Sequence, residues 1–191
     1  MNLIQRVQDI LLKPKDTWPV IDEEASTVES IYKEYLIYLA AIPAVAIFIG
    51  LHVVERLPVG STIVSGLVSQ VISYVLSLAI VYGLALIANE LAPKFDGTKN
   101  ILNAFKLMAY GSTALFVGGI FFLVPALSAL SVLANLYCIY IIYTGVPVLM
   151  KCPDEKAVPY TATVVACVFI AGLVVSMMLG VPMMGRGMRM W

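Results

Sequence analysis

The stretch LYCIYIIYTGVPVLMKCPDEKAVPY, residues 136–160, leads from a tyrosine-rich apolar segment through a Gly/Pro hinge and a short lysine loop to another apolar segment. As a helix, the apolar segment 126–150 is long enough to cross a hydrocarbon layer of about 30 Å. A second long apolar segment begins at residue 160. The short loop between the two therefore predicts neighbouring helices that cross the same membrane in opposite directions.

The composition extends this interpretation to the whole chain. Of the 191 residues, 61% are hydrophobic and 13% are charged, and the mean hydropathy is +0.94, well outside the range of soluble proteins. Twelve Lys and Arg residues balance twelve Asp and Glu residues. This balance gives no reason to expect a nucleic-acid partner. We predict an all-α, multi-pass protein whose surroundings are the lipid bilayer.

Five apolar stretches are long enough to span a membrane, and Gly, Pro or charged residues separate each from the next. The predicted spans of this five-helix bundle are residues 35–54, 63–88, 106–124, 126–150 and 160–182. Pro43 is expected to kink the first span. Pro125 leaves only a tight hairpin between the third and the fourth.

The sequence before the first span predicts a helix that lies in the membrane interface. Residues 3–12 place apolar side chains on one face and Arg6 with its polar neighbours on the other. Pro14 is expected to end this helix, and Trp18 is expected in the headgroup zone. Ser26 has the spacing of a capping box with Glu29, so we expect the first long helix to begin there.

The loop between the second and third spans is predicted to contain a turn and the start of a helix. Asp96 and Gly97 predict a turn, and Thr98 is the expected N-cap of the helix that follows.

The distribution of Lys and Arg predicts the orientation. Nine of these residues lie on one side of the predicted spans and three lie on the other, which places the N-terminus in the cytoplasm and the C-terminus outside. The chain then divides into a cytoplasmic segment (1–33), a membrane domain (34–182) and a Met-rich outer tail (183–191). We expect an inner cell membrane location, or the endoplasmic reticulum and Golgi membranes if the source is eukaryotic.

The predicted spans contain no Asp, Glu or Arg, and their one lysine, Lys106, lies at an edge where its side chain can reach the headgroups. Proton relays and ion-coupled carriers usually need ionisable groups inside the membrane. The residue sets of intramembrane proteases are missing as well. We therefore expect no enzymatic activity and no cofactor.

Small polar residues recur along two spans. Those of the second span follow every four residues, and those of the fourth share one stripe: Ser65, Ser69, Ser73 and Ser77, then Ser131 and Asn135. We hypothesise that the serine ridge packs on the Ser/Asn stripe, because small residues let helices approach closely and Asn135 needs a hydrogen-bond partner. The alternative is that the stripes line a path for a small neutral solute.

The tail is rich in methionine, whose thioether suits soft ions such as Cu(I) and Ag(I). The candidate ligands are Met183, Met184, Met188 and Met190. The alternative is that these methionines serve as adaptable packing. Apart from these four candidates, we expect no metal ligand.

The order of several short motifs around the spans resembles the YIP family (Ypt/Rab-interacting proteins), in its short prokaryotic inner-membrane branch. The residues that carry the resemblance include PKDTW at 14–18, FDG at 95–97 and YTGVP at 143–147. The positions assigned to the family motif or to interaction are Trp18, Phe95, Gly97, Tyr110, Tyr140, Gly145, Pro147, Lys151, Pro153, Lys156 and Tyr160.

The resemblance implies an integral membrane protein without known catalysis. Eukaryotic relatives act in vesicle traffic, associate with small GTPases and assemble with related membrane proteins. This chain lacks their long polar N-terminal region, so a small GTPase partner is not expected.

These observations favour a non-enzymatic membrane scaffold or assembly factor that engages a protein partner, a second copy or anionic lipid. Lys151 and Lys156 would each add about 1 kcal/mol of attraction to anionic lipid. The alternative function is a transporter or channel for a small neutral solute or a soft metal ion. It would use the Ser/Asn stripes or the Met-rich tail.

Overall fold

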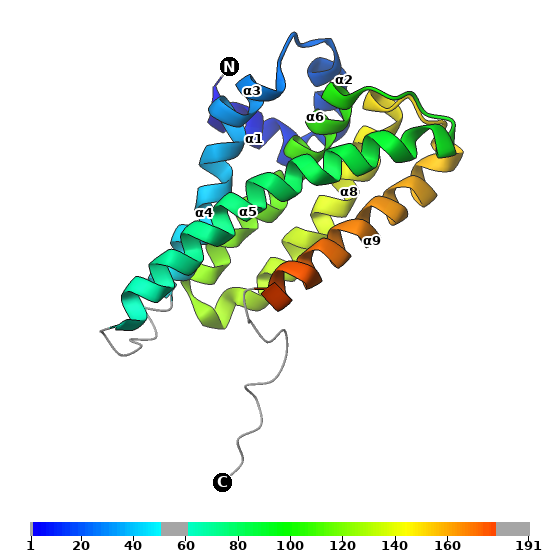
Figure 1. The fold of residues 1–191 in the computed structure, drawn as a ribbon. Helices are drawn as coiled ribbons and strands as arrows, with labels where there is room; N and C mark the ends of the chain where they lie inside the picture. Colours follow the sequence, from blue (N-terminus) through cyan, green and yellow to red (C-terminus); the bar gives the residue numbers. More distant parts are fainter. Residues whose placement is uncertain (1, 51–60, 179–191) are drawn as a thin grey trace.

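The computed structural model describes residues 2–50 and 61–178, and within them every regular element is helical (Figure 1). The α-helices are α1 (Leu3–Leu12), α2 (Pro14–Glu23), α3 (Val28–Ile31), α4 (Ile37–Ile49), α5 (Ser61–Leu91), α6 (Ile101–Gly111), α7 (Thr113–Gly118), α8 (Ser131–Leu149) and α9 (Asp154–Met178). Shorter helical segments are η1 (Tyr32–Leu36), η3 (Ala92–Phe95), η4 (Gly119–Leu123) and η5 (Pro125–Leu130).

Four stretches of the described chain are long and apolar enough to cross a membrane: Val28–Ile49, Gly66–Phe95, Ile101–Leu123 and Ala126–Leu149. They overlap the first four predicted spans, and the first three begin or end several residues away from the predicted bounds. The fifth predicted span, 160–182, overlaps α9, and its last residues lie outside the part of the chain that is described. The third and fourth stretches meet at Pro125, as the sequence predicts.

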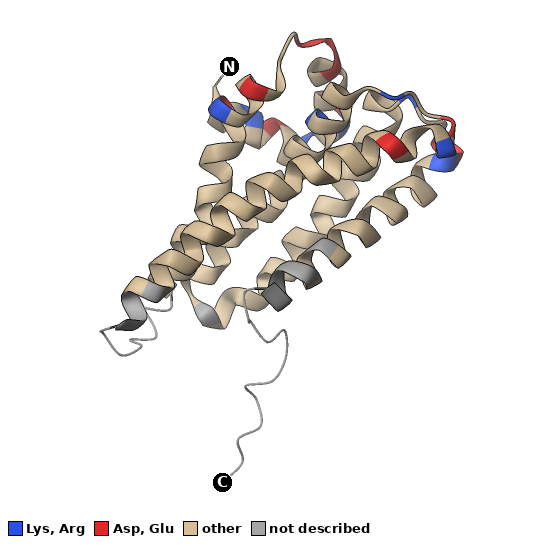
Figure 2. Ribbon diagram, viewed as in Figure 1, with Lys and Arg blue, Asp and Glu red and all other residues tan. Residues whose placement is uncertain are grey.

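The charged residues of the described chain gather at one end of the bundle (Figure 2). We call this the charged end. The opposite end carries apolar and small polar residues. Such a division is typical of a protein whose two ends face different environments on either side of a bilayer.

The buried core lies toward the charged end and is centred on α6, where every residue from Ala104 to Gly111 is buried. Helix α5 packs against α6 and α4, and α8 packs against α2, α6 and α7. Helix α9 packs against α8 and α5 and adds Ala157, Tyr160 and Val164 to the core.

Two helix starts differ from the prediction by one or two residues. Thr27, not Ser26, caps the first long helix, in a capping box completed by Ser30. Asn100, not Thr98, caps α6 by accepting hydrogen bonds from the next helical N–H groups. The Thr98 N–H instead donates to the Met150 carbonyl, 2.8 Å away, which ties the loop to the end of α8.

The N-terminal helices form a folded cap on the charged end, which we define as α1, α2 and their connection to α3 (residues 3–27). Helix α1 has the predicted bounds, and α2 begins at Pro14, where proline's missing N–H costs nothing. Ile10 is buried against the bundle, whereas Ile4 and Leu12 remain exposed. The cap therefore contacts protein on one side and leaves apolar side chains for the membrane interface on the other.

Trp18 fixes the cap to the bundle, and its predicted place in the headgroup zone is wrong. The side chain is 1% exposed, and its indole N–H donates to the Ile141 carbonyl (3.2 Å) and to Thr144 Oγ1 (3.1 Å). The ring lies over Gly145, where an added Cβ would come within 2.6 Å of it. The tryptophan is buried because α8 supplies both an acceptor pair and a gap of its own shape.

We predict that Trp18→Ala lowers the free energy of unfolding by about 3–5 kcal/mol, because it empties a large buried site and leaves polar groups of α8 without their donor. Thermal unfolding of the detergent-solubilised protein measures the change. Val20→Ala is the matched control, since Val20 lies on the same helix and is 57% exposed. Equal effects of the two substitutions would contradict the buried position of Trp18.

Candidate functional site

Arg6 lies inside the protein, although the sequence pattern placed it on the polar face of α1. It is 4% exposed, forms an ion pair with Glu24, and its guanidinium carbon lies 5.7 Å from the centroid of the Tyr110 ring. Tyr110 packs edge-on against Tyr35, at 4.8 Å, and the Tyr35 hydroxyl lies 2.6 Å from Thr113 Oγ1. This polar cluster joins the cap to α6 and to the start of the first span.

Lys106 does not reach the headgroups as the sequence suggested. It is 2% exposed, and its ammonium donates to the carbonyls of Ile21 (2.7 Å) and Glu24 (2.8 Å), with that of Asp22 at 3.5 Å. These carbonyls belong to the last turn of α2 and the residues after it, which have no partner within the helix. A lysine of α6 therefore caps α2 and offsets the negative end of its dipole.

Asp22 connects three further parts of the charged end. The Asn103 amide donates to Asp22 Oδ1 and to the Leu149 carbonyl, each at 3.1 Å. Lys151 forms an ion pair with Asp22 Oδ2 at 2.6 Å. The last turn of α2, the start of α6 and the end of α8 are thereby held in one arrangement.

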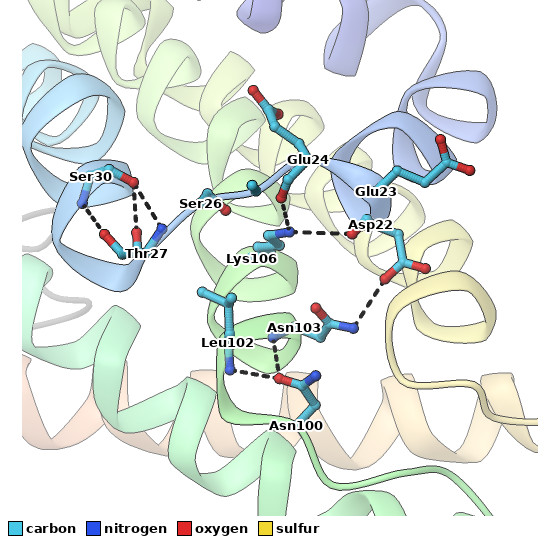
Figure 3. Close-up of a pocket in the computed structure, with 11 residues that line it drawn as sticks. Asp22, Glu23, Glu24, Ser26, Thr27, Ser30, Asn100, Leu102, Asn103 and Lys106 are labelled. Atoms are coloured by element: carbon cyan, nitrogen blue, oxygen red, sulfur yellow. Dashed lines mark hydrogen bonds between the residues drawn. The ribbon is translucent and has the colours of Figure 1, made fainter.

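These contacts build the walls of an open polar depression of about 720 Å³ at the charged end (Figure 3). The residues that line it are Asp22, Glu23, Glu24, Ala25, Ser26, Thr27, Ser30, Asn100, Leu102, Asn103 and Lys106. Figure 3 shows the Lys106 ammonium turned toward the backbone beside Glu24, and the Thr27 and Ser30 pair on the opposite wall. The lining thus contains several hydroxyl and amide groups, one lysine whose donors are already engaged, and three carboxylates, of which Asp22 and Glu24 are paired and Glu23 is exposed.

The contacts around Asp22 form one joint between segments of the charged end. A second joint contains other residues that the sequence assigned to the family motif. The rings of Phe95 and Tyr160 meet edge to face at 5.5 Å, and the Tyr160 hydroxyl donates to the Ala88 carbonyl. Gly97 lies so close to Cys152 that an added Cβ would come within 2.4 Å of the sulfur. This joint holds the loop before α6 against the loop before α9.

Both lysines of the 151–156 loop are paired within the protein. Lys151 pairs with Asp22, and Lys156 pairs with Asp96, whose left-handed backbone (φ 58°) forms the predicted turn. Each pair is solvent-exposed and contributes little to stability. The pairing nevertheless cancels part of the positive charge that was expected to attract anionic lipid.

The remaining motif residues lie around these joints. Tyr140 is 42% exposed and stacks on Tyr137, whose hydroxyl donates to the Leu11 carbonyl of the cap. Pro147 lies within α8, and Pro153 is exposed just before α9. The Met-rich tail, including Met183, Met184, Met188 and Met190, lies outside the described residues. Within the described part, no group of three or more His, Cys, Asp or Glu residues could hold a metal ion.

Ser77 of the serine ridge and Asn135 of the Ser/Asn stripe line the same crevice, and the packing of the two stripes on one another stays a prediction. Helix α5 makes its main contacts with α4, α6 and α9. The Ser77 hydroxyl donates to the Tyr74 carbonyl, and the Ser131 hydroxyl donates to the Ser128 carbonyl, each within its own chain segment. Asn135 is exposed and has no hydrogen-bond partner among the described residues.

The architecture defines a class: a multi-pass helical membrane protein with a folded cap at its charged end. The model of the Yip1 domain matches residues 9–176, so the chain belongs to the Yip1 family. It is 24% identical over 196 residues to the inner membrane protein YohC of Escherichia coli K12, covering 98% of this chain and 100% of YohC. YohC of Escherichia coli O6:H1 matches to the same extent. No solved structure gives a significant match.

The sequence pattern did not reveal that Arg6 and Lys106 have partners inside the protein. Apolar residues flank Lys106 at helical spacing, but a lysine in such a position usually keeps its ammonium in water, so the pattern does not signal burial. The acceptors of Lys106 lie 82 or more residues away in the sequence, so no local pattern identifies them.

We predict that Lys106→Met lowers the free energy of unfolding by about 2 kcal/mol, because the carbonyls at the end of α2 lose their donor. Protease cleavage between α2 and α3 should become faster in the same variant. Lys99→Met is the control, because Lys99 is 48% exposed and pairs only with the exposed Glu90. An unchanged cleavage rate in Lys106→Met would argue against the capping role.

We also predict that Cys152 reacts slowly with N-ethylmaleimide in the folded protein. Burial, and secondarily the charge of Asp96, raise the pKa of the Cys152 thiol, and its side chain is 3% exposed. A raised pKa means that less thiolate is present at pH 8 than for an ordinary cysteine, which slows alkylation. Peptide mapping by mass spectrometry before and after unfolding in SDS measures the difference, and equal labelling in both states would contradict the prediction.

Proposed function

We propose that this protein is a non-enzymatic organiser of the inner cell membrane, which assembles with other membrane proteins through its cap and the neighbouring loops on the cytoplasmic side. The excess of Lys and Arg on that side supports the orientation. The similarity to an inner membrane protein of Escherichia coli supports the location. In this proposal α9 is the fifth span and the C-terminus lies outside.

The observation that carries the proposal is the polar depression at the charged end. Its walls come from the cap and from α6, and they are held together by Lys106 and by the contacts of Asp22. A surface built in this way is already formed before a partner arrives, so less ordering entropy is lost on binding. Long-range contacts, rather than a flexible tether, therefore set its shape.

The charge of the depression favours a basic partner. Asp22 and Glu24 are each paired within the protein, whereas Glu23 is exposed on the rim. Cytoplasmic segments of other membrane proteins carry an excess of Lys and Arg next to their spans. Such a segment lies at the height of the cap and is opposite in charge to the exposed Glu23 carboxylate, which makes it the partner we expect.

The ion pairs of Lys151 and Lys156 favour a protein partner over anionic lipid on this face. Each lysine already has a carboxylate partner, so binding to a lipid headgroup would have to replace an existing attraction. The acidic rim also repels anionic headgroups.

Cross-linking in native membranes tests the proposal. With p-benzoylphenylalanine at position 25, an exposed alanine in the depression, we expect adducts with membrane proteins whose cross-linked peptides come from basic cytoplasmic segments. Glu23→Lys should lower the yield of these adducts severalfold, because it reverses a charge beside the photoreactive group.

Glu155→Lys is the matched control, since Glu155 is an exposed carboxylate at the same end but outside the depression. Equal losses in the two variants would mean that only the overall charge of the face matters. Adducts with lipid alone would show that this surface contacts headgroups and would overturn the proposal.

A further inference from the structure

A crevice of about 520 Å³ lies within the membrane-spanning part of the bundle, away from the cap. Its walls come from α5 and α9, and α8 with the adjoining ends of α6 and α7 forms its floor. Figure 1 shows α5 and α9 close together at the charged end and separated toward the other end. Tyr160 holds the closed end by its hydrogen bond to Ala88.

The crevice is apolar apart from four side chains, and three of these are already satisfied. Ser77 donates to the Tyr74 carbonyl (2.7 Å), Ser112 to the Met108 carbonyl (2.7 Å) and Cys138 to the Gly111 carbonyl (2.9 Å).

The fourth is Asn135, whose amide has no hydrogen-bond partner in the described part of the chain. An amide without a partner is costly in hydrocarbon, so a molecule that supplies one would be favoured at this point.

Gly172 widens the crevice. At this glycine an added Cβ would meet nothing within 4 Å, so no neighbouring segment fills the space beside it. The missing side chain leaves this part of the α9 wall open to a bound molecule.

The size and charge of the crevice indicate what can fill it. One turn of a helix about 10 Å wide occupies roughly 420 Å³, so a partner's transmembrane helix could not be accommodated along its length. The volume lies within the range of about 300–1,000 Å³ that is typical of small-molecule sites. No charged residue lines it, which disfavours a charged headgroup.

We propose that this crevice binds one neutral lipid, with its apolar chain between α5 and α9 and a hydroxyl group hydrogen-bonded to the Asn135 amide. A hydroxyl both donates and accepts, so it can satisfy either end of the amide. The apolar chain of the lipid lies against the apolar walls in place of the surrounding bilayer. The site is independent of the depression at the charged end and does not depend on the function proposed for it.

Photolabelling of the full-length protein in vesicles of phosphatidylethanolamine and phosphatidylglycerol tests the site. The probes are a long-chain alcohol with a diazirine and the alkane of the same length with the same diazirine. We expect the alcohol to label crevice peptides of α8 and α9 about fivefold more strongly than the alkane, the preference that one hydrogen bond in a membrane provides.

Asn135→Leu should remove the preference for the alcohol while the alkane still labels, because only the amide is lost. Gly172→Leu should lower labelling by both probes, because it fills the crevice. Gly83→Leu is the matched control: Gly83 is also a helical glycine at which an added Cβ meets nothing within 4 Å, and it does not line the crevice.

Three results would overturn the proposal. Labelling spread evenly over the lipid-facing helices would mean that the crevice is not a site. An unchanged alcohol preference in Asn135→Leu would remove the role of the amide. Labelling that appears only after a dimer is dissociated would mean that a second copy, rather than a lipid, covers the crevice.

Discussion

The burial of Trp18 against α8 is the contact on which the arrangement of the charged end depends. The indole N–H finds acceptors on Ile141 and Thr144, and the ring fits over Gly145, so α2 lies directly on a membrane-spanning helix. Once α2 is held there, its carboxyl end lies beside α6 and can be capped by Lys106. The N-terminal segment thereby contributes Ile10, Trp18 and Ile21 to the core.

The two ends of the bundle follow different packing rules. At the charged end, polar side chains are buried together and satisfy one another, which permits Arg6 and Lys106 to lie inside the protein. Away from it, α5 and α9 diverge around an apolar crevice. Lipid is as apolar as the side chains there, so burying them against one another gains little and the helices need not close.

The charges that indicate orientation are distinct from the charges that are available for binding. Counting Lys and Arg predicts which side is cytoplasmic, because insertion responds to the unfolded chain. After folding, Arg6 pairs with Glu24, Lys151 with Asp22 and Lys156 with Asp96. The face that carries most of the positive residues thus presents a depression in which Asp22 and Glu24 are paired and the Glu23 carboxylate is exposed, a property that net charge does not reveal.

The sequence by itself determined the helical class, the place of α1 and of four apolar stretches along the chain, the hairpin at Pro125 and the family. These features follow from local hydrogen bonds, side-chain periodicity and the length that a bilayer demands. Only the tertiary structure decided that Trp18 and Lys106 are buried and that Asn135 faces a crevice. The reason is that their environments come from segments far away in the chain, such as Ile141 for Trp18 across 123 residues, and no local pattern encodes a partner at that distance.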